Sequence, residues 1–290
     1  MSGFRVGLTT HISPGIHHLR CGPPRSAAVR SRRLNRGQRG QAPEGFIIYR
    51  LVLWNIDLTL VDVVRVSREA YAEAFRRVTG RPLVALPQQA GRSDSEIFFE
   101  SLALNDVSTG GSEQGGQDLL ARYTRELTAA FSARRDLLTR NGRLLPGALQ
   151  AARATAGLPG VIQSVLTGTI RPNAAEKLSA FGLADLFDLD IGGYGSDVYP
   201  RGSQLLASRV QAEEKYRVQI AARAVVYIAD SGRDVEAART AGAGCIAVAS
   251  GRSTVGDLRA AGADVVLTDL SDTAGVVQAV EQLTGVAASR

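Results

Sequence analysis

Oxygen-bearing side chains follow an apolar run near residue 50 and alternate along the chain. Asn55, Asp57 and Thr59 come directly after residues 51–54. Polar groups at alternate positions just beyond a buried strand are typical of an active-site rim. A carboxylate such as that of Asp57 can act as a general acid or base, whereas the neutral amide of Asn55 is a poor nucleophile. The pattern therefore indicates either a working catalytic site or an inactive relative of one.

Similar groups follow two later apolar runs, and an arginine lies at a predicted helix start between them. They are Thr167, Gly168 and Thr169 after 161–167, Asp230 and Asp234 after 225–229, and Arg201 at a predicted helix start. Carboxylates suit a hard cation such as Mg²⁺, and hydroxyl and guanidinium groups suit an oxyanion. Each residue alone also fits a structural role, such as a turn, a helix cap or a surface charge. Together, after successive strands, they favour phosphoryl chemistry.

Short strands alternating with helices must position these groups. Strands are predicted at 47–54, 161–167, 186–191, 225–229, 245–249 and 265–267, and helices at 172–181, 203–216, 233–241, 254–261 and 272–283. The strands are nearly continuous apolar runs, as expected of strands that are covered on both faces. Gly182 and Gly242 occupy expected helix C-cap positions. The alternation predicts an α/β fold, a doubly wound parallel sheet.

A helical segment interrupts the alternation after the first strand. Helices are predicted at 66–78, 94–104 and 117–138, with a glycine-rich link at 108–116. We therefore expect an α/β core from 47–64 and 144–290 and an inserted helical cap from 65–143. The cap should lie over the ends of the sheet strands, where ligands bind in such folds.

The basic charge is concentrated in the first 46 residues. They hold eight arginines and one acid, Glu44, so their net charge is +7. Since the net charge of the whole chain is +6, the remainder carries −1. The segment lacks periodicity and is predicted to be a disordered basic arm. It could bind nucleic acid or an anionic surface, it has the composition of a transit peptide, or it is a dispensable leader.

Scarce residues exclude several chemistries in the body of the chain. All three histidines lie in the arm, and the only cysteine after it is Cys245. A Ser-His-Asp triad, a Cys-His pair and a His/Cys zinc site are therefore excluded there. The lack of a disulfide framework points to a reducing compartment, so we expect a cytoplasmic protein. The early apolar run at 46–54 is interrupted by Arg50 and is too short to span a bilayer, so no membrane partner is expected.

Five segments together resemble the motifs of the haloacid dehalogenase superfamily, in its phosphoglycolate-phosphatase-like branch with a helical cap. They are WNIDLTLVD at 54–62, AGRSDSEIF at 90–98, LLPGALQAA at 144–152, VLTGT at 165–169 and YIADSGRDVEAARTAGA at 227–243. The first resembles the family motif Asp-x-Asp-Gly-Thr-Leu-Val-Asp. The likeness covers residues 47–283. It implies a Rossmann-like core, a magnesium-dependent phosphomonoester hydrolase and a small phosphorylated metabolite as substrate.

Carried over residue by residue, the resemblance implies a role for each position. Asn55 occupies the nucleophile position, Asp57 is the general acid and base, Thr167 and Gly168 contact the phosphoryl group, Arg201 stabilises it, Arg92 contacts the substrate, and Asn55, Asp57, Asp230 and Asp234 would hold Mg²⁺. The family usually has a lysine where Arg201 is chosen here. Lys177 is interpreted as a surface residue.

Two departures from the first motif put turnover in doubt. Asn55 replaces the attacking aspartate, which should weaken Mg²⁺ binding and impair catalysis severely. Leu58 replaces a glycine, which matters if the backbone there requires a positive φ. Three interpretations follow: an impaired phosphatase that still binds a phosphate ligand or a partner, a hydrolase in which Asp57 activates water, and a non-catalytic scaffold that docks nucleic acid through its arm. Neither the substrate nor the oligomeric state can be read from the sequence.

Overall fold

A five-stranded parallel sheet forms the centre of the fold. The computed structural model describes residues 48–109, 113–196 and 200–285, so the predicted arm and residue 47 lie outside the described residues. The strands are ordered β4-β1-β5-β6-β7, with bounds β1 (Arg50–Trp54), β4 (Val161–Val165), β5 (Val225–Ala229), β6 (Gly244–Val248) and β7 (Val265–Leu267). All four neighbouring pairs are parallel. This confirms the α/β fold with a parallel sheet.

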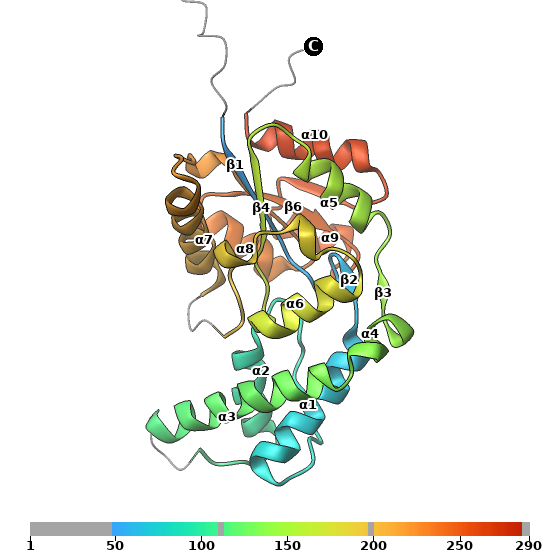
Figure 1. The fold of residues 1–290 in the computed structure, drawn as a ribbon, viewed down its shortest axis with the longest axis vertical. Helices are drawn as coiled ribbons and strands as arrows, with labels where there is room; N and C mark the ends of the chain where they lie inside the picture. The colour runs from blue at the N-terminus through green and yellow to red at the C-terminus, as the bar shows by residue number, and fades with distance from the viewer. Residues whose placement is uncertain (1–47, 110–112, 197–199, 286–290) are drawn as a thin grey trace, which may run out of the picture. The chain divides into compact units, whose positions relative to one another are not determined.

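Helices cover both faces of the sheet (Figure 1). The helices on one face are α5 (Ala148–Ala156), α6 (Arg171–Ala180) and α10 (Thr273–Leu283), and those on the other are α7 (Arg201–Tyr216), α8 (Gly232–Thr240) and α9 (Val255–Ala260). Val52 and Trp54 of β1 face the first layer, and Leu51 and Leu53 face the second. Successive side chains point to opposite faces of a strand, so continuous apolar strands need both layers.

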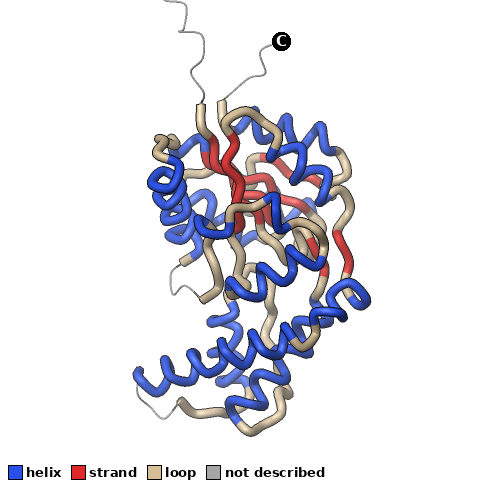
Figure 2. Tube along the Cα trace, in the orientation of Figure 1, coloured by secondary structure: helices blue, strands red, loops and turns tan. Residues whose placement is uncertain are grey.

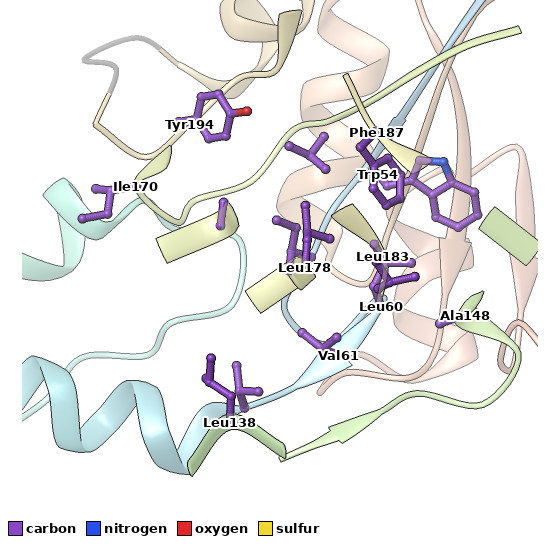
Figure 3. Packing of buried hydrophobic residues seen from close by; sticks show 14 of the residues in the cluster. Trp54, Leu60, Val61, Leu138, Ala148, Ile170, Leu178, Leu183, Phe187 and Tyr194 are labelled. Carbon is purple, nitrogen blue, oxygen red and sulfur yellow. The ribbon is translucent and has the colours of Figure 1, made fainter. Parts of the chain in front are cut away.

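The core beside β1 is built from large side chains (Figure 3). Trp54 meets Phe187 edge to face, with ring centroids 6.4 Å apart. The indole nitrogen of Trp54 donates to Gln163 Oε1 at 3.0 Å, so its one polar atom is satisfied although the residue is fully buried. This packing fixes the end of β1, from which the polar residues 55–59 emerge.

Four helices follow β1 and lie beyond its carboxyl end (Figures 1 and 2). They are α1 (Val64–Thr79), α2 (Asp94–Leu104), α3 (Glu113–Ser132) and α4 (Arg135–Asn141). The chain leaves and returns through two short strands, β2 (Val61–Asp62) and β3 (Arg143–Leu144), which pair antiparallel. Phe98 of α2 stacks on Tyr123 of α3, with ring centroids 4.1 Å apart.

The single helix predicted at 117–138 is wrong, because the structure breaks it between α3 and α4. Arg134 leaves helical geometry with φ −112° and ψ 13°. Its guanidinium is held by Glu73 of α1 at 2.5 Å and by the carbonyl of Ala130. Neither glycine nor proline lies at this break, and the spacing of apolar residues continues across it. The sequence therefore contains no local signal that the helix ends there.

The strand predicted at 186–191 is also wrong. The segment forms two short 3₁₀ helices, η1 (Ala184–Leu186) and η2 (Leu189–Ile191), while a third, η3 (Ala222–Ala224), precedes β5. The Asp188 side chain accepts a hydrogen bond from the backbone N–H of Asp190. This bond closes a local turn, which replaces the predicted strand. No helix was predicted where α5 lies. Gly182 and Gly242, both with φ 68°, follow the C-cap residues Phe181 and Ala241, so each glycine lies one position beyond the C-cap at which it was expected.

Among the helices that the structure describes, none combines the length and the apolar character that crossing a membrane requires.

Candidate active site

One cavity lies at the carboxyl ends of β1, β4 and β5. It leaves about 50 Å³ for the centres of water-sized molecules. Seven of the eight predicted site residues line it, namely Asn55, Asp57, Arg92, Thr167, Gly168, Arg201 and Asp230. Parallel strands end at one edge of a sheet, which brings residues together that are up to 175 positions apart in the sequence. The eighth, Asp234, does not line the cavity.

The turn after β1 is tight and holds Leu58 in the left-handed region, with φ 59°. The backbone N–H of Leu58 donates to the carbonyl of Val61 at 2.8 Å, and its carbonyl accepts from Ser250 Oγ at 2.6 Å. A non-glycine residue pays about 1–2 kcal/mol for this conformation. The position therefore does have the backbone geometry that a glycine adopts easily, and the leucine side chain lines the cavity.

The carboxamide of Asn55 directs its nitrogen toward two oxygens of the site. Nδ2 donates to the backbone carbonyl of Asp57 at 3.1 Å and to Asp230 Oδ1 at 3.0 Å. Thr59 Oγ1 donates to the same Asp230 oxygen at 3.1 Å. Asn55 is 6% exposed. Its amide is therefore fixed by the groups around it and offers N–H donors, not a negative oxygen, to the space between Asp57 and Asp230.

Lys177 is a buried residue of the site, so its interpretation as a surface residue is wrong. It is 1% exposed, and its ammonium contacts both carboxylate oxygens of Asp57, at 2.8 and 2.7 Å, and Thr169 Oγ1 at 2.9 Å. Side chains of a helix lean toward its N-terminus, so a lysine on α6 can reach back to the strand end where α6 begins. The charge also lies 5.2 Å from the ring centre of Phe131. A long helical lysine predicts exposure, and only the fold reveals its partner.

A second buried ion pair joins Arg201 and Asp234. Arg201 is the first residue of α7, and its guanidinium contacts Asp234 and donates to the Arg92 carbonyl at 3.5 Å. Asp234 is fully buried in the first turn of α8 and also accepts hydrogen bonds from Tyr227 Oη at 3.0 Å and Ser231 Oγ at 2.5 Å. The Asp234 carboxylate is thus committed to structural partners.

Asp230 is the carboxylate of the cavity that has no cationic partner among the contacts just described. Burial, together with the nearby Asp234 carboxylate, raises the pKa of Asp230 to about 7. The hydrogen bonds from Thr59 and Asn55 oppose this rise by stabilising the charged form. The hydrogen bonds that Asp230 accepts from these two side chains come from neutral donors.

The segment before α2 closes the cavity from the helical side. The backbone N–H of Asp94 donates to the Gly168 carbonyl at 2.7 Å, and its carboxylate accepts from Tyr71 Oη at 2.6 Å and from the Ile170 N–H at 2.8 Å. Burial raises the pKa of Asp94. A Cβ on Gly168 would lie 1.9 Å from the Arg92 carbonyl oxygen, so this approach requires glycine. Asp94 and Tyr71 line the cavity as well, and sequence analysis did not select them.

Arg92 reaches the cavity mainly through its backbone. Its guanidinium forms an ion pair with Glu100 on α2. Arg92 is therefore placed at the cavity as predicted, but its charge is used within the helical segment.

The residues do not fit a divalent cation well. The described ranges contain no group of three or more His, Cys, Asp or Glu side chains that could hold a metal ion. Of the four residues predicted to hold Mg²⁺, Asn55 presents its nitrogen, while the carboxylates of Asp57 and Asp234 are paired with Lys177 and Arg201. Mg²⁺ is usually bound through one or two carboxylates with oxygen ligands around them, and of these four residues only Asp230 offers a carboxylate without an ion pair.

The molecule is thus an α/β protein with a polar cavity at the carboxyl edge of its parallel sheet and helices beyond that edge. The family model for haloacid dehalogenase-like hydrolases matches residues 52–239, and a second model, for HAD-hydrolase-like proteins, matches 207–273. The chain belongs to the haloacid dehalogenase-like hydrolase family, which confirms the family resemblance seen in the sequence. No curated protein matches the chain.

Solved structures share the fold at low sequence identity. A hydrolase from Pseudomonas syringae is 20% identical, with a TM-score of 0.57, and the match covers 80% of this chain and 98% of that one. A HAD hydrolase, family IA, variant 3, from Entamoeba histolytica is 17% identical, with a TM-score of 0.56, covering 80% and 99%. A structure described as a predicted phosphoglycolate phosphatase from Haemophilus somnus is 18% identical, with a TM-score of 0.54, covering 81% and 100%. At these identities the likeness concerns the fold.

Proposed function

We propose that the chain binds the phosphoryl group of a small phosphorylated molecule in the cavity and hydrolyses phosphomonoesters very slowly. In this proposal α1–α4 act as the cap over the site. The observation that carries it is the neutral amide of Asn55, whose nitrogen faces Asp57 and Asp230 in the position that the family resemblance gives to the attacking aspartate. An amide has no negatively charged oxygen with which to attack phosphorus.

Binding of the oxyanion is supported by the other groups that line the cavity. Thr167 Oγ1 accepts from the Thr169 N–H at 3.2 Å, which leaves its own hydroxyl proton for a ligand. Arg201 adds positive charge at the wall. An aspartate at position 55 would repel a phosphoryl group about 4 Å away by about 4 kcal/mol per unit charge at an effective dielectric constant of 20. The amide removes this repulsion together with the nucleophile.

Hydrolysis of a generic aryl phosphate tests the loss of turnover. The parent protein should be nearly inactive, and Asn55→Asp with Mg²⁺ should raise kcat by several orders of magnitude, since removal of a nucleophile costs about 10⁶-fold in a well-studied protease. Adding Leu58→Gly should raise it further by relieving the left-handed leucine. Efficient turnover by the parent would contradict the proposal.

A second candidate is a hydrolase in which Asp57 acts as a base on water without a covalent step. It is favoured by one observation: the Asp57 side chain remains 32% exposed and lines the cavity. Lys177 works against it, because its ammonium occupies both oxygens of the Asp57 carboxylate, the atoms that would have to accept a proton from water. If the parent turns over well and Asp57→Asn abolishes this activity, the second candidate replaces the first.

A further inference from the structure

The amide nitrogen of Asn55 bridges two oxygens from distant parts of the chain. The Asp57 carbonyl lies 3.1 Å away, and Asp230 Oδ1 lies 3.0 Å away. A primary amide has two N–H donors, so both oxygens receive one each. Asp230 Oδ1 also accepts from Thr59 Oγ1 at 3.1 Å. These oxygens are therefore satisfied by the protein's own donors.

Only this orientation of the amide suits its surroundings. In the reverse orientation the amide oxygen would face a carboxylate oxygen and a carbonyl oxygen at the same distances, with no proton between them. With Asp230 ionised, a cation placed among the three oxygens would be needed to hold them together. An ion entering this space must therefore first turn the Asn55 amide and break both of its hydrogen bonds, within a side chain that is 6% exposed.

The charged groups nearby would attract an entering cation only weakly. Lys177 occupies both oxygens of the Asp57 carboxylate, and Arg201 occupies that of Asp234. The attraction of a divalent ion would thus depend on Asp230. Hard cations bind weakly where the number of charged ligands is small.

We propose that the Asn55 amide nitrogen takes the place of a divalent cation between the Asp57 carbonyl and Asp230. The site is complete without such an ion and receives an oxyanion in its absence. The part of this inference that concerns the ion stands alone, whereas the part that concerns the oxyanion rests on the function proposed above.

Titration of the full chain with Mn²⁺, followed by water proton relaxation, tests the ion. The parent should show no saturable site up to about 1 mM, the weak end of cation affinities in proteins. Asn55→Asp should create one saturable site below that concentration. Asn141→Asp adds the same charge at an exposed position outside this cavity and should behave as the parent does. A saturable site in the parent, or none in a folded Asn55→Asp variant, overturns the inference.

Binding of orthophosphate, measured by calorimetry with excess EDTA and again with Mg²⁺, tests the oxyanion. The Kd of the parent should change by less than about twofold between the two conditions, and that of Asn55→Asp should become at least about tenfold lower with Mg²⁺, because the ion would then link the new carboxylate to the phosphate. Binding by the parent that requires Mg²⁺ overturns the inference. If the parent binds no orthophosphate in either condition, the proposed function fails. The Mn²⁺ titration still tests whether the Asn55 amide takes the place of a divalent cation. If Asn55→Asp does not fold, the Mn²⁺ titration of the parent alone still tests the inference, because a saturable site in the parent would overturn it.

Discussion

Replacing Lys177 by methionine removes one charge of a buried pair and keeps most of the side-chain volume. Lys177 is 1% exposed, and its ammonium makes three hydrogen bonds of 2.7–2.9 Å to Asp57 and Thr169. The substitution leaves the Asp57 carboxylate without its cation. We therefore expect a large loss of stability, although the removed side chain is polar and the new one is apolar.

The size of this loss follows from the exposure of the two partners. Removing one member of a buried ion pair costs about 3–5 kcal/mol, because the other charge stays behind uncompensated. The Asp57 side chain is 32% exposed, so water can hydrate part of the orphaned charge. The lower end, about 3 kcal/mol, is the expected value. In a domain of this size each 1 kcal/mol lowers Tm by about 2–4 °C.

Urea unfolding at pH 7, followed by circular dichroism, measures this change. Lys215 provides the matched control as the only other lysine of the chain. Its side chain is 42% exposed while paired with Asp188 and Asp190, so Lys215→Met should have a much smaller effect. Adding Asp57→Asn to Lys177→Met should restore part of the lost stability, since the orphaned charge disappears. A loss for Lys177→Met no larger than that for Lys215→Met would refute the reasoning.

Two further predictions concern the helical closure and the arm. Gly168→Ala places a Cβ 1.9 Å from the Arg92 carbonyl oxygen, so the backbone must shift at a cost of about 1–3 kcal/mol in urea unfolding; Gly157→Ala, whose nearest atom is 3.5 Å away, is the control and should be nearly neutral. If the eight arginines of residues 1–46 dock nucleic acid, binding by the intact chain should fall steeply with salt and vanish when the segment is removed; a flat salt response removes this alternative.

Local signals in the sequence predicted most of the elements and the edge of the sheet that carries the site. β5 and β7 have the predicted bounds, as does α2. Apolar runs, helical periodicity and turn residues are properties of neighbouring residues, so one sequence suffices to reveal them. The parallel order of strands then places Asn55, Thr167 and Asp230 at one edge, and all three line the cavity.

The pairing of the side chains was decided by the tertiary structure alone. Asp57 could meet Arg201 or Lys177 as far as the sequence tells, and the packing of α6 against the sheet selects Lys177, 120 residues away. The break after α3 and the 3₁₀ turns near Asp188 likewise depend on distant or side-chain contacts that periodicity does not contain. The sequence shows that residue 55 is an amide, but which of its two ends faces Asp230 depends on the donors and acceptors that the fold gathers around it.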